Sequence, residues 1–556
     1  MTETEHGGIL AARALAAEGI DTIFALPGGH NLPLFEGARV AGMRLIDTRH
    51  EESAVMMAEG WALATGRVGV ASVTAGPGLT NAVPGIAEAH KAGAPVVVIS
   101  GRTGLHQRGR EAVQDVDQLA LVAPITKWRE QCLAPERIPQ YVREAVHQAR
   151  SGAPGVAYLE IPQDVFGSHA QAAEKPWPAG HPDARSAAPQ GDVERAAELL
   201  ATSARPVVLA GSGAFFSGAG DALRDFAERS GVPVITTSAA RGLLDDDHPR
   251  CAGGLVHGGI ALASSDAVLV LGSRFNANLL WGGAPLFPPA GRVVQVDVRA
   301  EHLGGERLPE VGLAGDARTV LEALAEAWPK PAEQFDGWCE QARQGAAMSF
   351  QSWEAETERP ANGVHPGWLA RETARFAEEL GGCTTVSDGG DSVLWGIAFF
   401  RAHRPGTQLY IGSALGTLGI GLPFAVAART ARDEPVILFT GDGAFGLSAM
   451  ELDTAARHRL PVVCVVVNNG GWGDVRHEQR AFYGHEADVG AILSTMRYDL
   501  LAEAVGGHGE TVESPEQLRP ALARAVEFDG PSVINVLTDP DVMSDLMKNL
   551  GGMGVM

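Results

Sequence analysis

Two polar motifs in the last third of the chain contain residue types that bind a metal ion through oxygen. A Gly-Asp-Gly motif at 441–443 follows the apolar run 435–440, and an Asn-Asn pair at 468–469 follows the apolar run 461–467. Carboxylate, amide and main-chain carbonyl oxygens are hard ligands that suit Mg²⁺ or Ca²⁺. Mg²⁺ usually keeps positions open for phosphate oxygens, and glycines beside Asp442 allow the main chain to approach a phosphate closely. The two motifs therefore predict a metal-bridged diphosphate and a cofactor that carries it.

The apolar runs before these motifs predict two buried strands of a parallel sheet. Both runs are rich in Val and Ile without polar alternation, which is typical of strands covered on both faces. Ligands of such sheets bind at the carboxyl ends of the strands. We therefore expect Asp442 and Asn469 to lie side by side. A strand-end turn without a ligand is the alternative for either motif taken alone.

Alternating apolar strands and alanine-rich helices divide the 556 residues into three α/β blocks. This pattern is typical of doubly wound parallel sheets. We predict domains over residues 1–173, 192–330 and 366–556, with a Pro/Ala/Gly-rich linker before the second. The expected strands are 22–26, 44–47, 69–74, 95–100 and 156–161 in the first block, 206–210, 233–237, 267–271 and 292–297 in the second, and 384–388, 435–440, 461–467 and 531–536 in the third.

Charge and composition exclude several classes of partner. The chain has 44 basic and 67 acidic residues and a formal net charge of −23, which argues against nucleic acid and anionic membranes as partners. No apolar run approaches the roughly 20 residues that span a membrane. The acidic first residues lack the basic start and apolar core of a signal peptide. Five scattered cysteines without a CxxC pair are typical of reduced thiols. We expect a cytoplasmic protein with a small-molecule substrate.

The second block contains a weak nucleotide-binding pattern. Gly211 and Gly213 follow an expected strand, and Asp297 ends a later one. The third glycine, Gly218, does not fit the GxGxxG spacing, and Asp297 lies far beyond the distance of ~20 residues at which the acidic partner is expected. A structural Rossmann-like domain is therefore favoured over one that binds FAD or ADP.

Glu51 begins a predicted helix, 51–65, directly after the second expected strand. Taken alone, a carboxylate favoured by the helix dipole is the simpler interpretation. Several motifs together change that interpretation: Arg49-His50-Glu51, Thr-Ala-Gly-Pro-Gly-Leu-Thr-Asn at 74–81, Ala-Pro-Ile-Thr-Lys-Trp at 123–128, and Gly441-Asp442-Gly443 with Asn469. With them, the whole chain resembles the thiamine-diphosphate-dependent enzymes of the benzaldehyde lyase and acetolactate synthase type.

The resemblance implies a function for each block. The first would bind the pyrimidine ring and the third the diphosphate, on either side of a central Rossmann-like domain. Asp442, Asn469 and the Gly471 carbonyl would hold Mg²⁺, while Glu51 would hydrogen-bond the pyrimidine and promote its activating tautomer. The cofactor lies between subunits in this family, so a homodimer or homotetramer is implied. The other residues expected to line the cofactor are Gly76, Asn81, Gly389, Gly390, Gly416, Leu418, Gly441, Gly443, Ala444 and Trp472.

Two further residues bear on the reaction. His30 follows the first expected strand, where benzaldehyde lyase has a catalytic histidine that the acetolactate synthases lack. Gln114 matches a cofactor-facing glutamine of both groups. A histidine and an amide suit proton transfer at a hydroxyl and polarisation of a carbonyl. The alternatives are a turn histidine for His30 and an exposed helix residue for Gln114.

The main prediction is a C–C bond lyase/carboligase that resembles benzaldehyde lyase and acts on α-hydroxy ketones and aldehydes. The alternative is an acetolactate synthase-like 2-oxo acid decarboxylase/ligase or a 2-hydroxyacyl-CoA lyase. Gln163, Val393 and Gly412 replace polar or aromatic lining residues of benzaldehyde lyase, and Asp474 stands where that enzyme has a small residue. These departures concern the substrate and not the cofactor. A nucleotide-dependent oxidoreductase and a cofactor-binding regulatory protein are weaker hypotheses.

Overall fold

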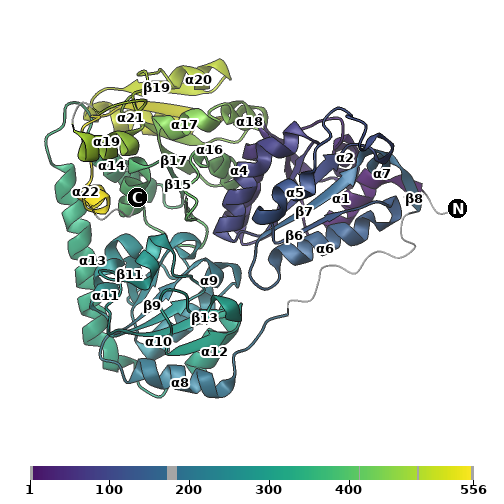
Figure 1. The fold of residues 1–556 in the computed structure, drawn as a ribbon. Coiled ribbons are helices and arrows are strands. Elements are labelled where there is room, and N and C mark those ends of the chain that lie inside the picture. Colours follow the sequence, from purple (N-terminus) through teal and green to yellow (C-terminus); the bar gives the residue numbers. More distant parts are fainter. Residues whose placement is uncertain (1–3, 172–183, 412, 485–486, 553–556) are drawn as a thin grey trace. The chain divides into compact units, whose positions relative to one another are not determined.

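The computed structural model describes residues 4–171, 184–411, 413–484 and 487–552 (Figure 1). They form two compact units. Unit 1 comprises Met1–Ala184, Leu415–Arg432 and Ser448–Leu460, and unit 2 comprises Arg185–Ala414, Asp433–Leu447 and Pro461–Met556.

Unit 1 contains a six-stranded parallel sheet in the order β3-β2-β4-β5-β7-β6. Helix α16 (Gly421–Ala431) joins this unit by packing against α3, where a Cβ on Gly60 would lie 2.9 Å from the Cα of Phe424. The strands are β2 (Thr22–Ala25), β3 (Arg44–Asp47), β4 (Gly69–Val73), β5 (Val96–Arg102), β6 (Trp128–Gln131) and β7 (Val156–Pro162). The other helices are α1 (Gly7–Ala17), α2 (Leu32–Ala41), α3 (Glu51–Thr65), α4 (Pro77–Ala92), α5 (Gln118–Val122), α6 (Ile138–Arg150), α7 (Gln163–Gly167) and α18 (Glu451–Arg457).

The central part of unit 2 contains a second parallel sheet, in the order β11-β10-β9-β12-β13-β14. Buried aliphatic and aromatic side chains cover both faces of this sheet. The strands are β9 (Pro206–Ala210), β10 (Val234–Thr236), β11 (Cys251–Gly254), β12 (Ala267–Leu271), β13 (Arg292–Asp297) and β14 (Val311–Ala314). The helices are α8 (Gln190–Ala201), α9 (Ser212–Phe216), α10 (Gly220–Ser230), α11 (Leu255–Ser264), α12 (Ala317–Ala327) and α13 (Asp336–Thr357).

The C-terminal sheet, also in unit 2, has the order β16-β15-β17-β18-β20-β19 and is again parallel. Numbered within its own block, this is the order 2-1-3-4-6-5, which is also the order of the N-terminal sheet. The strands are β15 (Thr384–Asp388), β16 (Gln408–Tyr410), β17 (Val436–Gly441), β18 (Val463–Asn468), β19 (His508–Val512) and β20 (Ser532–Leu537). The helices are α14 (Pro366–Glu379), α15 (Asp391–Phe399), α17 (Asp442–Ser448), α19 (Gly473–Tyr483), α20 (Asp499–Ala504), α21 (Pro515–Glu527) and α22 (Asp545–Gly552).

The predicted fold class is confirmed, since all three six-stranded sheets are parallel and carry helices. Each predicted strand is present within two residues at either end, and α3 has the predicted bounds. The prediction missed β6, β11, β14, β16 and β19, all of which are edge strands. It also missed a short antiparallel pair, β1 (Thr4–His6) with β8 (His169–Gln171). Among the described residues, no helix combines the length and apolar character needed to cross a membrane.

Candidate functional site

A buried asparagine shapes the turn that carries His30. Asn31 accepts a hydrogen bond from the Gly28 N–H at 2.9 Å and donates to the Leu26 carbonyl at 3.1 Å. Its amide also reaches the Ser72 hydroxyl at 3.2 Å, which ties the turn after β2 to β4. The turn is thereby fixed at the carboxyl edge of the sheet, with His30 half-buried on it.

The structure brings His30 and Gln114 together. The His30 ring Nδ1 lies 3.3 Å from the Thr74 hydroxyl, and the Gln114 side chain lies near the ring. Burial lowers the pKa of His30, and hydrogen bonding to Gln114 opposes that shift. Gln114 lies in a turn before α5 and has a φ of 65°, so it is not the exposed helix residue of the alternative interpretation. Gly76 has a φ of 59° and packs against Gln114.

Glu51 is the first residue of α3 and is 7% exposed. Its Oε2 accepts a hydrogen bond from the Asn81 amide at 3.1 Å. A Cβ on Gly78 would lie 3.4 Å from the other carboxylate oxygen. Glu51 and Asn81, which the sequence places 30 residues apart, therefore share one site at the start of α3 and α4.

The main chain before Glu51 is held by Glu451, a residue that the sequence analysis did not identify. Glu451 lies on α18 and is 1% exposed. Its carboxylate accepts hydrogen bonds from the N–H groups of Arg49 and His50, each at 3.1 Å. Burial raises its pKa, and these hydrogen bonds oppose the shift. The sequence around Glu451 gives no local indication of this contact, because Arg49 lies 402 residues earlier in the chain.

Gly416 and Leu418, which were predicted to line the cofactor, also belong to unit 1. Gly416 is exposed with a φ of 70°, and Leu418 is half-buried. Between them, the Thr417 N–H donates to the buried carboxylate of Glu88 on α4 at 3.4 Å. Leu418 is therefore not a fully buried core residue.

The Gly-Asp-Gly motif lies at the carboxyl end of β17 in unit 2. Asp442 is 1% exposed and accepts hydrogen bonds from Gly443 N–H at 2.9 Å and Gly471 N–H at 3.2 Å. The Asn469 side-chain oxygen accepts from the same Gly471 N–H at 3.1 Å. The adjacency expected of Asp442 and Asn469 is therefore present, with Gly471 joining them. Burial raises the pKa of Asp442 to about 6.

Glycines allow close packing around Asp442. A Cβ on Gly443 would lie 2.6 Å from the Trp472 ring, so Trp472 packs directly on the main chain. Gly389 has a φ of 109° and lies beside Gly441. These contacts bring the ends of β15, β17 and β18 together. Ala444 is buried in the first turn of α17.

Asp474 packs against the turn that follows β15. A Cβ on Gly390 would lie 2.5 Å from the Cβ of Asp474. Burial and the neighbouring carboxylate of Asp391 raise the pKa of Asp474 to about 7. Asp474 is therefore not a solvated loop carboxylate, because it lies against a predicted diphosphate-binding turn.

Comparisons with known proteins match all three blocks. The N-terminal, central and C-terminal domain models of thiamine pyrophosphate enzymes match residues 5–121, 193–324 and 388–536, respectively. A probable acetolactate synthase from Mycobacterium bovis is 37% identical over 99% of this chain and 98% of its own. The chain belongs to the thiamine pyrophosphate enzyme family. Each matched segment lies inside one predicted domain, whose bounds stay a prediction.

Two further relatives are named for two different activities. A 2-hydroxyacyl-CoA lyase from Oryza sativa subsp. japonica is 33% identical over 96% of this chain and 95% of its own. The large subunit of acetolactate synthase isozyme 2 from Escherichia coli is 31% identical over 96% of each chain. These names favour the alternative reaction over the benzaldehyde lyase-like one that was the main prediction.

The residues around Asp442 fit a divalent cation. The hydrogen bonds that lower the pKa of Asp442 come from main-chain N–H groups, among them those of Gly443 and Gly471. A buried carboxylate with only neutral donors is costly to ionise, and a bound cation offsets that cost. Mg²⁺ would find oxygen ligands here in Asp442, Asn469 and the Gly471 carbonyl.

The hydrogen bonds at the carboxyl ends of β9 and β12 argue against a nucleotide site in the central sheet. Its strand order places the switch point between β9 and β12. There the Gly211 N–H donates to the Leu271 carbonyl, and the Gly213 N–H donates to the Gly272 carbonyl, both at 2.9 Å. Protein carbonyls therefore occupy donors that a phosphate would use. FAD or ADP stays the less favoured prediction.

The other three departures from benzaldehyde lyase, besides Asp474, lie in different places. Gln163 is exposed at the start of α7 and donates to the Gly29 carbonyl at 3.2 Å, beside His30. Val393 is half-buried in α15. Gly412 lies outside the described residues.

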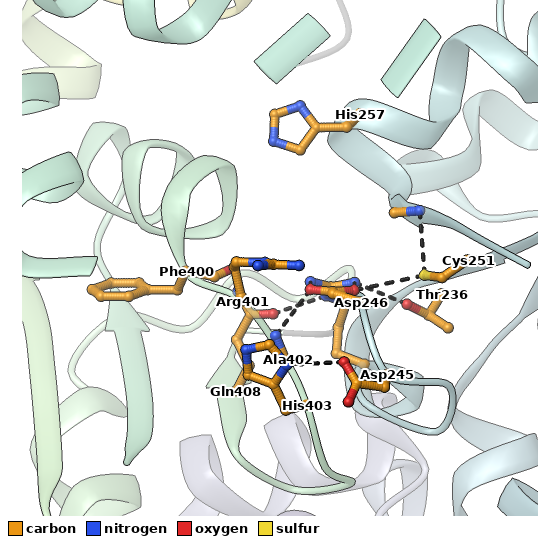
Figure 2. A network of polar contacts seen from close by, with 12 residues as sticks. Thr236, Asp245, Asp246, Cys251, His257, Phe400, Arg401, Ala402, His403 and Gln408 are labelled. Carbon is orange, nitrogen blue, oxygen red and sulfur yellow. Dashed lines mark hydrogen bonds and ion pairs between the residues drawn. The ribbon is translucent and has the colours of Figure 1, made fainter. Parts of the chain in front are cut away.

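A second polar network in unit 2 lies at the amino-terminal side of β16 (Figure 2). The Ala402 N–H donates to Asp246 at 2.9 Å, and His403 contacts Asp245 at 2.9 Å. Asp245, Asp247 and His403 are close enough to share a cation. They instead form ion pairs, with Glu378 contacting the other ring nitrogen of His403 at 2.9 Å. This network holds protein segments together.

Proposed function

We propose that this thiamine pyrophosphate enzyme binds thiamine diphosphate with Mg²⁺, and that the residues described above in each unit are its ligands. Asp442, Asn469 and Gly471 hold the metal and the diphosphate, while Glu51 and Asn81 hold the aminopyrimidine. The family assignment and the geometry of each group of residues support this placement. When bound, thiamine diphosphate supplies a nucleophilic carbon and accepts the electron pair of a bond broken beside a carbonyl.

We further propose that the reaction breaks or forms the C–C bond of a 2-hydroxy carbonyl compound. His30, which packs on Gly101 beside Thr74, and Gln114, which packs on Gly76, carry this proposal. Because burial lowers the pKa of His30, its ring is neutral at ordinary pH and can accept a hydroxyl proton. The Gln114 amide can donate a hydrogen bond to the adjacent carbonyl oxygen.

The names of the relatives support two candidate substrate classes. A 2-hydroxyacyl thioester is the first, because its cleavage requires the transfer of a hydroxyl proton, for which His30 is suited. A 2-oxo acid that is decarboxylated and joined to a second 2-oxo acid is the second candidate. The similarity to named acetolactate synthases over nearly the whole chain supports it.

A substrate panel distinguishes these reactions. The enzyme is incubated with thiamine diphosphate, Mg²⁺ and, separately, a 2-hydroxyacyl-CoA, benzoin, pyruvate or an aldehyde. We expect aldehyde release from the thioester, measured by chromatography. Acetolactate from pyruvate alone would establish the second candidate. Cleavage of benzoin alone would restore the main prediction from the sequence, and no turnover of any compound would contradict the proposed reaction.

Substitution of His30 tests its assigned role. We expect His30→Ala to lower kcat by about 10²–10⁴-fold, the usual contribution of an acid–base group, while thiamine diphosphate binds with nearly unchanged affinity. Steady-state kinetics and cofactor titration measure the two effects. The control is His169→Ala, because His169 is exposed on β8. Equal losses in kcat and in cofactor affinity would refute the role.

The cofactor arrangement of the family also supports a homodimer or homotetramer as the active form. Light scattering of the purified protein with thiamine diphosphate and Mg²⁺ measures the assembly. An active monomer would exclude both.

A further inference from the structure

A buried glutamine, Gln118, lies behind the two candidate catalytic residues of unit 1. It begins α5, and its side chain is fully buried. Its Oε1 accepts a hydrogen bond from the Gly76 N–H at 2.9 Å. A main-chain N–H can only donate, so the amide oxygen must face Gly76 and the amide nitrogen must point away from it.

The amide nitrogen of Gln118 faces acceptors on β5 and β7. It lies 3.2 Å from the Gly101 carbonyl and 2.8 Å from the Tyr158 hydroxyl. The Glu160 carboxylate and the Ser100 hydroxyl lie at 3.2 and 3.3 Å. The amide therefore has partners at both ends, which fixes the side chain in one orientation.

The two glycines that Gln118 contacts are those against which the candidate catalytic residues pack. A Cβ on Gly76 would lie 2.8 Å from the Cα of Gln114. A Cβ on Gly101 would lie 2.5 Å from the main-chain carbonyl carbon of His30. A shift of either glycine would therefore displace the residue packed on it, because close-packed interiors transmit strain.

We propose that Gln118 is a positioning residue, which sets the distance between His30 and Gln114 by holding Gly76 and Gly101 in place. The role rests on the proposed function, in which His30 and Gln114 act on the substrate. Gln118 does not act on the substrate itself, since it is fully buried and its amide is engaged by protein groups.

A buried ion pair anchors Gln118. Glu160 is fully buried and pairs with Arg102, whose Nη1 lies 3.1 Å from its Oε1. Burial raises the pKa of Glu160, and Arg102 opposes that shift. Gln131 donates to the same carboxylate at 2.6 Å, but its hydrogen bonds do not involve Gly76 or Gly101. Gln131 therefore offers a matched control for Gln118.

Three variants of the holoenzyme test the positioning role. Gln118→Met removes both hydrogen-bonding ends, and Gln118→Asn keeps an amide that is one methylene too short to reach both glycines. We expect kcat to fall by about 10–100-fold in each, since a displacement of ~1 Å can cost 100-fold. KM and the affinity for thiamine diphosphate should stay within about twofold of the wild type, as should every parameter of the control, Gln131→Met.

The reactivity of His30 gives a readout that does not require turnover. Diethyl pyrocarbonate modifies the neutral imidazole, so peptide mass spectrometry across a pH series reports the pKa of His30. Burial lowers this pKa and the Gln114 hydrogen bond raises it. Gln118→Asn and Gln114→Ala should therefore both lower it, and the double variant should lower it no further than Gln114→Ala.

The two readouts separate failure of the role from failure of the reaction. Wild-type kcat and an unshifted His30 titration in Gln118→Asn would overturn the positioning role, even if Gln118→Met fails to fold. Equal effects in Gln131→Met would also overturn it, because the cause would then be the shared carboxylate. If no substrate is turned over, the proposed reaction fails and the His30 titration alone decides the role.

Discussion

The N-terminal and C-terminal sheets share the strand order 2-1-3-4-6-5 but have different chemistry at their carboxyl edges. At the edge of the N-terminal sheet, side chains contact one another, as His30 does with Gln114 and Glu51 with Asn81. At the edge of the C-terminal sheet, main-chain N–H groups and glycines surround one buried carboxylate, Asp442. One topology thus supports two kinds of site.

The sites at the two sheet edges should respond differently to substitution. Where side chains form the site, a substitution removes a chemical group and should reduce turnover before binding. Where main chain and glycines form the site, an added atom displaces the main chain and should reduce binding first. The variants that follow test this contrast, beginning with the largest expected effect.

The first variant removes the carboxylate of the N-terminal site. We expect Glu51→Ala to lower turnover by about 10²–10⁴-fold, as loss of an acid–base group does, with the fold intact by circular dichroism. The control is Glu52→Ala, which alters the next and half-buried carboxylate. Undiminished activity of Glu51→Ala would contradict the role of Glu51 in activating the cofactor.

The second variant removes the charge of the C-terminal site. We expect Asp442→Asn to weaken Mg²⁺ binding by about 100-fold or more, since loss of even supporting groups costs 10–100-fold. Calorimetric titration with Mg²⁺ in the presence of thiamine diphosphate measures the effect. Mg²⁺ affinity equal to that of the wild type would exclude Asp442 as a ligand.

The third variant adds one methyl group beside Asp442. Gly443→Ala places a Cβ 2.6 Å from the Trp472 ring, and overpacking of this kind costs about 1–3 kcal/mol. We expect about tenfold weaker cofactor binding and a lower unfolding temperature. Gly446→Ala is the control, because no atom lies within 4 Å of its Cβ, and it should stabilise α17 by about 0.5–1 kcal/mol. Equal behaviour of the two variants would contradict the main-chain character of this site.

The fourth variant alters His403, which lies before β16, at the edge of the C-terminal sheet opposite to Asp442. A substitution of His403 should affect stability and not turnover. Burial lowers the pKa of His403, but hydrogen bonds to Asp245 and Glu378 raise it by more, so the net shift is upward. The stabilisation is then complete below the unfolded pKa of about 6.5 and is lost as the pH rises through the folded value. Asp247 also faces the ring.

We therefore expect His403→Gln to lower stability by less than ~1 kcal/mol near pH 6, because the pair is partly exposed, and to have no effect near pH 9. Thermal unfolding across this pH range measures the difference. Adding Glu378→Gln to His403→Gln should lower the stability little further. A loss that is the same at both pH values would show that the ion pairs do not cause it.

The sequence predicted the inner strands and missed most edges for one physical reason. Strands buried on both faces, such as β18 (Val463–Asn468), are continuous apolar runs that stand out in the sequence. Edge strands such as β6 (Trp128–Gln131) and β19 (His508–Val512) contain charged and polar residues because solvent reaches one side. Their place in the sheets comes from pairing with distant strands, which no local pattern records.

The site residues divide in the same way. Asp442 and Asn469 were predicted as neighbours because parallel strands end at one edge, and the structure joins them through Gly471. Glu451 and Gln118 were missed, since each acts through contacts to the main chain of other segments. Burial of polar side chains cannot be read from residue type alone.

From the sequence alone we could predict the family, the three parallel sheets and candidate residues for thiamine diphosphate and Mg²⁺, because strand periodicity and short motifs are local properties. Only the tertiary structure showed that His30 contacts Gln114, that Glu451 holds the chain before Glu51, and that Gln118 joins two glycines behind the site. Those contacts link segments far apart in the chain. They depend on packing and on the satisfaction of buried hydrogen bonds, which the folded chain alone determines.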